Sequence, residues 1–447
     1  MIQKVYYLPK GTEPTKEVIN NLLTGNARKS EVDYYNRLEA YMRSEPVTER
    51  PAPHQILAVT NHARYISKTN VGYLLGNPVQ YLVSEGTNID AIVDLYKDQT
   101  IGKLDVELAN DASVFGHAFE RIYNDENSDC NSTRIDPRNI MLIYDDTVKH
   151  EKMFAIIYIP SYDENGKIID GQFEMTLLTP TMVMERTLKA GELIGDPSLD
   201  REHSFGEVPV VEYLNGVDRI GDFEPVVSLI DAYNILQSDR VLDRERLVDA
   251  ILAFYGSDFD KEQRKELKDS RILSNLPPDA KIEYITKNIN ESDADVLRQN
   301  IVTDIHKISM TPDMSDKEFA GNSSGVAIAY KLLAFEQHIK DKERYFEDAL
   351  MDRFRIYNFF LNKKSNMPIV TNNEVDAVFK RALPINNLEV SQMINNLVGI
   401  VDKETLVAQL SFVQDAKETV ELAEQEENAS LSLGNYGTEQ PNEANEE

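Results

Sequence analysis

Cysteine and long apolar stretches are scarce in this chain of 447 residues. The single cysteine, Cys130, cannot form an intrachain disulfide, and no group of cysteines and histidines has the spacing of a zinc finger, so we expect a reducing compartment. The longest dense apolar run, Met153 to Ile159, is far shorter than the roughly 18 residues of a spanning helix. The first residues lack the apolar stretch of a signal peptide. We therefore expect a soluble protein, made in the cytoplasm, without membrane contact.

Positively charged residues are also fewer than negatively charged ones. The chain has 47 lysines and arginines against 76 aspartates and glutamates, which gives a formal net charge of −29. Such an acidic surface repels duplex phosphates and acidic lipid headgroups, so it argues against a repressor-like or peripheral membrane protein, which needs clustered lysines and arginines. It does not exclude a protein past which DNA slides.

What the sequence does contain is typical of a globular protein. Apolar residues make up 41% and charged residues 28% of the chain. At roughly 100 to 200 residues per domain, the length predicts two to four domains, or one large body with extensions. We find no internal repeat.

Helical spacing of apolar residues dominates the first part of the chain. It predicts two polar helices within residues 13–45, a third helix from about His54 to Leu75 and a fourth from about Asn88 to Gly116. The third helix should stop at Gly76-Asn77-Pro78, because proline cannot continue a helix.

A different pattern follows from Ala118 to about residue 214. Short runs rich in β-branched and aromatic residues, such as Met153 to Ile159, are separated by turns such as Asp163 to Gly166. This pattern predicts a mostly antiparallel sheet, so the fold class should be α+β.

Long helices return in the second half. One is expected over residues 222–256, with Asp222 as its N-cap and Gly256 at its end. A small strand pair should follow at 271–273 and 281–286, then a helix over 292–310. A very long helix is expected from about Ser324 to Leu361, and helices of this length are typical of a bundle or an assembly.

The end of the chain should hold one more strand near 374–384 and then helices to about Glu424. Residues 425–447 contain six glutamates and no lysine or arginine, which predicts a disordered acidic tail.

Motifs that carry chemistry are mostly missing. The sequence has no His-Glu-x-x-His pair, no Gly-x-Ser-x-Gly elbow and no phosphate-binding loop. The glycine-containing stretch at 321–325 is better explained as a helix start, and its capping residues are Gly321, Asn322, Ser323 and Ser324. Asp145 and Asp146 are a candidate metal or acid-base pair, although aspartates are common in turns at strand ends. The seven histidines are scattered and are interpreted as packed or surface residues.

Five stretches taken together resemble the portal proteins of tailed bacteriophages, in particular those of siphophages from Gram-positive hosts. In chain order these stretches are Asn70–Tyr81, Ile143–Thr147, Gly206–Tyr213, Gly321–Ala327 running into Lys331–Glu336, and Phe379–Pro384. No single stretch is diagnostic, but their order and their spread make the match specific.

The resemblance implies a portal-type ring subunit with a wing, a two-helix stem, a small α/β clip, a long body helix and a helical crown. On this chain it implies the following parts: the wing at 1–221, the stem helices at 222–256 and 292–310, the clip at 257–291, the tunnel loop at 311–324, the long helix at 325–363, a strand returning to the wing at 364–384, the crown at 385–424 and the acidic tail at 425–447.

The resemblance also implies a function and partners. The chain would form a ring, usually a dodecamer, at one capsid vertex of the virion, serving as a channel for DNA packaging and ejection. Its partners would be terminase, a head-completion adaptor (head-tail connector) protein, the major capsid and scaffolding proteins and double-stranded DNA, and it would need no cofactor and no catalytic residue.

Two groups of residues follow as candidate sites. The tunnel loop would present Asp313, Met314, Ser315, Asp316, Lys317 and Glu318 to DNA. The charged residues of the first stem helix, which form either a solvated face or a ring of intersubunit pairs, are Asp239, Arg240, Asp243, Arg244, Glu245 and Arg246. The alternatives are a hydrolase or nuclease that uses Asp145 and Asp146 with a divalent metal, and a non-portal adaptor that binds partners through 257–291.

Overall fold

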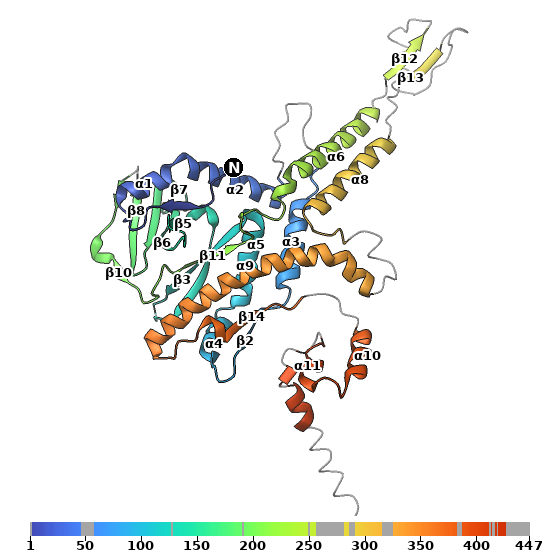
Figure 1. The fold of residues 1–447 in the computed structure, drawn as a ribbon. Coiled ribbons are helices and arrows are strands. Elements are labelled where there is room, and N and C mark those ends of the chain that lie inside the picture. The colour runs from blue at the N-terminus through green and yellow to red at the C-terminus, as the bar shows by residue number, and fades with distance from the viewer. Residues whose placement is uncertain are drawn as a thin grey trace, which may run out of the picture. The chain divides into compact units, whose positions relative to one another are not determined.

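The computed structural model describes most of the chain in two compact units. The described residues are 2–45, 58–126, 128–189, 192–248, 251–255, 281–285, 291–314, 325–381, 387–410, 413, 416–417 and 419–425. The first unit comprises Met1–Gly321 with Tyr330–Ala382, and the second comprises Asn322–Ala329 with Leu383–Glu447. Helices and strands are mixed throughout the first unit, so the fold class is α+β, as predicted (Figure 1).

The largest sheet has seven strands in the order β1-β5-β6-β7-β8-β10, with β9 also paired to β8. These strands are β1 (Tyr6–Leu8), β5 (Ile140–Asp145), β6 (Lys152–Tyr162), β7 (Ile168–Leu178), β8 (Met182–Lys189), β9 (Glu192–Ile194) and β10 (Arg201–Glu202). Every pairing is antiparallel except that of β1 with β5. The prediction of a mostly antiparallel sheet is therefore confirmed.

A turn predicted from sequence joins β6 and β7. Asp163 Oδ1 accepts hydrogen bonds from the backbone N–H groups of Asn165 and Lys167, at 2.9 and 2.8 Å. Gly166 has φ +74°, a conformation that glycine adopts without steric cost. The aspartate and the glycine thus set the register of this long hairpin.

A second sheet has three strands in the order β11-β3-β4, formed by β3 (His117–Asn124), β4 (Cys130–Ile135) and β11 (Val210–Leu214). Two short 3-10 turns, η1 (Pro137–Asn139) and η2 (Pro197–Leu199), lie in the connections of the two sheets. An apolar cluster that includes Phe119, Leu142, Leu178 and Val210 packs between the sheets. The sheets therefore share one core.

Five helices precede and cover this core: α1 (Lys16–Thr24), α2 (Asn26–Met42), α3 (His62–Leu75), α4 (Asp90–Asp98) and α5 (Ile101–Phe115). The third helix was predicted to begin at His54, but residues 58–61 are not helical, so this prediction is wrong for the residues that are described. The helix begins after Asn61, whose side chain caps it by accepting a hydrogen bond from the Arg64 N–H. Residues 54–57 lie outside the described residues.

The predicted single helix from Asn88 to Gly116 is in fact two helices. The break lies at Gln99 and Thr100, where Thr100 has φ +53° and cannot continue a right-handed helix. The end at Gly116 is confirmed. A Cβ on Gly116 would lie 1.9 Å from the carbonyl oxygen of Arg219, so only glycine fits there.

The hairpin of long helices contains α6 (Val227–Val248) and α8 (Glu291–Ile308), which pack side by side, and a 3-10 turn, η3 (Glu224–Val226), precedes α6 (Figure 1). The prediction that the first helix extends to Gly256 is wrong. Ile251–Tyr255 forms strand β12, which pairs antiparallel with β13 (Lys281–Ile285). The run Ile-Leu-Ala-Phe-Tyr is rich in residues that favour strands, and a partner strand decides its conformation.

Residues 271–273, the predicted partner of 281–286, lie outside the described residues, as does most of the interval 257–291. Asp222 is not the N-cap that we predicted. Its carboxylate is buried and points to Ser113, Asn215 and Lys342 instead.

The longest helix is α9 (Gly325–Ser365), which confirms the prediction of a very long helix. A 3-10 turn, η4 (Asn372–Glu374), then leads into β14 (Val375–Val378), which pairs antiparallel with β2 (Gln80–Val83). The predicted strand near 374–384 is thus real but shorter, since 379–381 are not in a strand and 382–384 lie outside the described residues.

The second unit contains α10 (Asn387–Leu397) and α11 (Lys403–Val407), and its described residues between 416 and 425 are helical. Asp402 caps α11 through a hydrogen bond from the Thr405 N–H, 2.8 Å. Helices after 385 are therefore confirmed in the described ranges. Beyond residue 425, the predicted acidic tail lies outside the described residues.

Candidate functional site

The segment that leaves α8 is attached to the body by its backbone. Met310 has φ +53°, which turns the chain sharply after the helix. His306 Nδ1 then donates to the carbonyl oxygen of Thr311, 2.9 Å. The Tyr65 hydroxyl on α3 donates to the carbonyl of Pro312, 3.0 Å, and accepts from the N–H of Met314, 2.8 Å. One tyrosine thus holds two backbone groups at the start of the loop.

A buried side-chain contact strengthens this attachment. Asn70 on α3 donates from Nδ2 to the hydroxyl of Thr311 and to the carbonyl of Ile66, both at 2.8 Å. Asn70 and Thr311 are both fully buried. Because a buried polar group without a partner is costly, each of these two residues constrains the other.

Two histidines pack at the same junction. The rings of His62 and His306 meet edge-on with centroids 5.9 Å apart, and Asp313 Oδ2 lies 3.9 Å from His306 Nε2. Burial, with a smaller contribution from His306, lowers the pKa of His62 to about 4, although Asp313 acts in the opposite direction. His62 is therefore neutral at pH 7.

The long helix α9 is anchored by a buried arginine. Arg353 donates from Nε to both carboxylate oxygens of Glu120, at 2.9 and 2.8 Å, and from Nη1 to Asp105, 2.7 Å. The Tyr213 hydroxyl also donates to Glu120, 2.6 Å. These contacts join α9 to α5 and to the three-stranded sheet.

A second buried pair lies further toward the start of α9. Lys342 Nζ donates to Asp222 Oδ2, 2.6 Å, and the same carboxylate accepts from Ser113 and Asn215. Burial alone would raise the pKa of Asp222, but Lys342, His338 and the hydrogen bonds hold it well below its usual range. Asp222 is therefore a charged anchor between α9 and the segment that enters α6.

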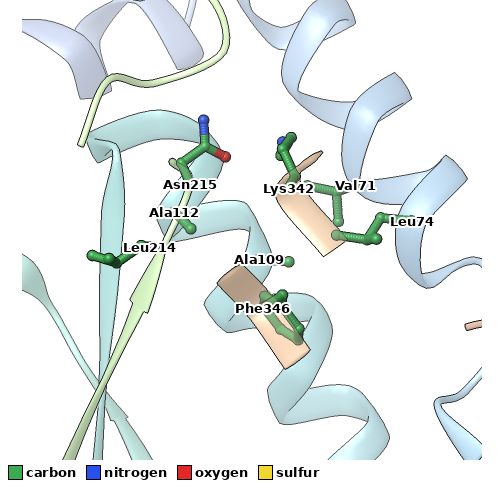
Figure 2. Close-up of a pocket in the computed structure, with 8 residues that line it drawn as sticks. All are labelled: Val71, Leu74, Ala109, Ala112, Leu214, Asn215, Lys342 and Phe346. Carbon is green, nitrogen blue, oxygen red and sulfur yellow. The ribbon is translucent and has the colours of Figure 1, made fainter. Parts of the chain in front are cut away.

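A small cavity lies beside this pair (Figure 2). Its walls come from α3, α5, α9 and the end of β11, and Asn215, Lys342 and Phe346 are among the lining residues. Its volume is about 10 Å³, which is about the space of one water molecule. We interpret it as a packing gap and not as a ligand site.

Three of the sequence motifs meet in one cluster. Tyr73 of the first motif donates to Glu336 Oε2, 2.6 Å, and Arg381 of the last motif contacts Glu336 Oε1 at 3.1 Å. Arg381 also pairs with Glu343, 2.5 Å. The cluster links α3, α9 and the segment after β14, so the motif residues contact each other across more than 300 positions of sequence.

The other two motifs also meet. Tyr144 donates to Glu212, and Glu212 accepts further hydrogen bonds from His117, 2.7 Å, and from Arg219, 2.9 Å for both nitrogens. Burial would raise the pKa of Glu212, but Arg219 and His117 hold it well below its usual range. This carboxylate joins the large sheet to the three-stranded sheet.

Asp145 and Asp146, the candidate metal pair, have contacts typical of a turn. Asp145 Oδ1 accepts from the hydroxyl of Thr147, 2.7 Å, and from the N–H of Glu151, 3.0 Å, and Asp146 Oδ1 accepts from the N–H of Lys10, 3.2 Å. Burial opposes the charge on Asp145, yet these hydrogen bonds lower its pKa. Within the described ranges, no three His, Cys, Asp or Glu side chains are grouped so as to hold a metal ion.

Comparison with known proteins decides the family. A sequence profile described as "Phage portal protein, SPP1 Gp6-like" matches residues 24–431. The chain belongs to this family. The portal protein of Bacillus phage SPP1 is 23% identical over 375 residues, which cover 80% of this chain and 73% of that protein. The portal protein of Clostridium phage phiCD119 is 22% identical over 249 residues, which cover 52% of this chain and 51%, about half, of that protein.

The chain is thus a phage portal protein with a role at the capsid vertex, as the five motifs predicted. None of the helices in the described ranges combines the length and the hydropathy that crossing a bilayer requires.

The structure describes only the start of the predicted tunnel loop of this portal protein. Asp313 is half-buried beside His306, and Met314 is exposed. The remaining predicted loop and cap residues lie outside the described residues: Ser315, Asp316, Lys317, Glu318, Gly321, Asn322, Ser323 and Ser324. Their role stays a prediction.

The predicted charge ring of the stem lies on α6. Arg240 donates to Gln237 Oε1, 3.3 Å, and Asp239 also has a polar partner within the chain. The side chains of Asp243, Arg244, Glu245 and Arg246 lie outside the described residues, so pairing between subunits stays a prediction.

Sequence reasoning missed the residues that hold the loop, namely Tyr65, Asn70, His306 and Thr311. One signal was available, because Asn70 is an amide on the mostly apolar buried face of α3 and a buried amide needs a partner. The partner itself lies 241 positions away in the sequence, and local patterns do not identify it.

Proposed function

We propose that this portal protein assembles as a closed ring, usually a dodecamer, through which double-stranded DNA is packaged and later ejected. In this proposal the chain supplies no catalytic residue and takes no cofactor. It is synthesised in the host cytoplasm and docks terminase, the head-completion adaptor, and the major capsid and scaffolding proteins.

The observation that carries the proposal is the hairpin of α6 and α8. Its described residues expose apolar side chains on both helices: Val241, Val296, Leu297 and Ile308. Leu297 is 51% exposed and Val296 is 57% exposed. A helix pair with apolar residues on its outer surface is stabilised when copies around an axis cover them. The hairpin is therefore assigned to the stem.

The other parts follow from this assignment. The wing takes 1–221, the clip takes the interval between the stem helices with β12 and β13, the long body helix is α9, and the crown takes 385–424. The end of the first stem helix moves from residue 256 to Val248, since β12 begins at Ile251.

The tunnel loop, 311–324, is assigned to the channel wall. Its start is held by Tyr65 and His306, and α9 begins directly after it at Gly325. An acidic wall limits the adhesion of moving DNA, and a single Lys317 among Asp316 and Glu318 offers one phosphate contact. Screening over about 8 Å restricts this effect to the nearest residues.

Electron microscopy of the purified full chain, with its mass measured by light scattering, tests the ring. Rings with a central channel and a mass close to that of a dodecamer are the expected result. Compact single subunits at every concentration would contradict the proposal and favour the adaptor alternative. Metal-dependent hydrolysis lost in Asp145→Asn would favour the hydrolase alternative.

The loop assignment has its own test, in which Lys317→Ala is compared with Lys364→Ala on the exposed end of α9. Both variants should form rings, but only Lys317→Ala should change the amount of DNA packaged per particle. Loss of rings in Lys317→Ala would contradict a channel role.

A further inference from the structure

A cavity of about 190 Å³ lies between the three-stranded sheet and the end of the large sheet, away from the stem and the loop. Arg121 and Tyr123 of β3 form one wall. Leu178 of β7, Val183 of β8 and Arg201 of β10 form the other. Nothing in the proposed channel function uses this cavity.

Arg121 is the unusual residue in its wall. Its guanidinium lies 5.9 Å from the centre of the Tyr123 ring, and its Nε is buried without a hydrogen-bond acceptor. Among the described residues, no hydrogen bond or ion pair is formed by the Arg121 side chain, although Glu185 attracts its charge. Burial lowers the pKa of Arg121, which means that the charged form is stabilised less here than in water.

Other arginines of the chain contrast with Arg121, because carboxylates pair with them. Arg134, on the neighbouring strand, pairs with both carboxylate oxygens of Asp111, and Arg353 pairs with Glu120 and Asp105. Arg121 is half-buried, and Glu185 compensates its charge only in part because it forms no ion pair with it, so the position favours an anion from outside the chain.

Several other polar groups of the wall already have partners within the chain. His203 donates from Nε2 to the carbonyl of Thr179, 2.8 Å, and its Nδ1 accepts from the N–H of Phe205, 3.4 Å. Arg201 pairs with Glu185, and Asp125 accepts from the N–H of Asp129, 2.8 Å. Among the basic residues of the described wall, Arg121 is therefore the one whose donors are uncommitted.

A wider groove of about 420 Å³ provides a comparison. Its cationic residues are already neutralised, since Lys152 pairs with Asp352, 2.9 Å, and Arg355 pairs with Glu207, 2.8 Å. Volume alone thus does not single out a site. The unpaired guanidinium distinguishes the smaller cavity.

We propose that the Arg121 cavity binds a carboxylate group. A planar guanidinium forms two parallel hydrogen bonds to a carboxylate. A singly charged carboxylate suits the site better than a phosphate dianion, because Asp125, Glu202 and Glu185 add negative charge around it. The volume is below the ~300 Å³ of a typical drug-sized pocket, so the ligand is a short acid or one acidic side chain of a protein partner. This proposal is independent of the channel function.

Chemical modification of arginine tests the site on the assembled full-length protein. p-Hydroxyphenylglyoxal reacts with accessible guanidinium groups, and mass spectrometry follows each arginine. Glutarate, and separately a short peptide with one central glutamate, serve as probes, with sodium chloride at matched ionic strength as the control.

The rate at Arg121 should fall at least fivefold with either probe, while the rate at the exposed Arg64 stays constant. If only the peptide slows the modification of Arg121, the bound carboxylate belongs to a protein partner. If both probes slow it, the cavity also binds small acids. Equal rates at Arg121 with glutarate, peptide and chloride would overturn the proposal.

Thermal unfolding of Arg121→Met provides a second readout. In buffer free of carboxylates this variant should unfold at the same temperature as the wild type or higher, because it removes an unpaired cation. Glutarate should raise the midpoint of the wild type only, since a ligand stabilises the state that binds it. Arg134→Met, which leaves Asp111 unpaired, should lower the midpoint. If Arg121→Met lowered the unfolding midpoint as much as Arg134→Met does, Arg121 would have a partner within the protein and the proposal would be contradicted.

Discussion

Arg353 and Glu120 form an ion pair in which Nε of the arginine is shared by both carboxylate oxygens, and the pair is wholly shielded from solvent, with both side chains at 0% exposure. The pair joins the middle of α9 to the central strand β3, although 233 positions separate the two residues. A charge pair in this environment contributes little when intact, but each partner becomes very unfavourable when it is left alone. The position of α9 on the sheet therefore depends on it.

Replacing Arg353 by methionine should lower the free energy of unfolding by about 3–5 kcal/mol, because Glu120 and Asp105 then lack their cation. Thermal or urea unfolding followed by circular dichroism measures the change. Arg355→Met is a matched control two residues away. It breaks a similar pair with Glu207 that is partly exposed, and its effect should be within about 1 kcal/mol. Equal losses in the two variants would contradict the special role of Arg353.

Elements with a strong local pattern were predictable from sequence. The long helix α9 and the strands β5, β6 and β7 follow from period and composition over their own residues, so their prediction needed no distant partner. The end of the helix at Gly116 was also predictable, since glycine is the residue that its backbone requires.

Elements that depend on distant partners were not predictable. The run Ile251–Tyr255 directly follows a helical pattern although its residues also favour strands, and its pairing with the distant β13 decides between the two. Asp222 has the sequence context of a helix cap, but Lys342, 120 positions later, attracts its carboxylate into the core. Tertiary contacts override the local preference in both cases.

The candidate site likewise contains residues that the sequence identified and contacts that it did not. The motifs contained the right residues, because Tyr73, Glu336 and Arg381 meet in one cluster. Their order in the sequence identified the family but not these contacts, since each pair is separated by tens or hundreds of positions. Tyr65 lay outside every motif, and only the structure reveals its two hydrogen bonds to the loop.

Tyr65→Phe should release the start of the proposed tunnel loop while keeping the fold. The change removes the hydroxyl that holds Pro312 and Met314, and each lost hydrogen bond contributes about 1 kcal/mol. Hydrogen exchange at the Met314 amide should accelerate about tenfold or more, as measured by mass spectrometry. Tyr34→Phe, which removes a hydrogen bond to Glu224, is the control and should leave that amide unchanged. If the Met314 amide exchanges at the wild-type rate in Tyr65→Phe, the start of the loop is held by another residue.

Acid should weaken the junction around His62. The pKa of this histidine is about 4 in the folded chain and about 6.5 in an unfolded one, so between these values only the unfolded state binds the proton. Stability should therefore be fully present above about pH 6.5 and should fall as the pH decreases toward 4. The loss of midpoint temperature between pH 7 and pH 5 should be smaller in His62→Gln than in the wild type. Parallel curves for the two proteins would assign the acid sensitivity to other groups.

Leu297→Glu should prevent ring assembly without unfolding the subunit. Leu297 is 51% exposed on α8, so in a single subunit the carboxylate of the substituted glutamate reaches water. In the proposed ring it would lose the ~1.5–3 kcal/mol of a buried leucine at each interface and would place a charge there. Light scattering should show a large loss of ring mass, while circular dichroism stays that of the wild type.

Val148→Glu is the matched control for this variant, because Val148 is 98% exposed in the turn between β5 and β6, away from the helix hairpin. It introduces the same charge on an apolar surface position and should assemble as the wild type does. Two further outcomes separate the possible explanations. Rings in both variants would place the subunit interface away from α8, whereas loss of rings in both would show that added negative charge alone opposes assembly of a chain that already carries −29.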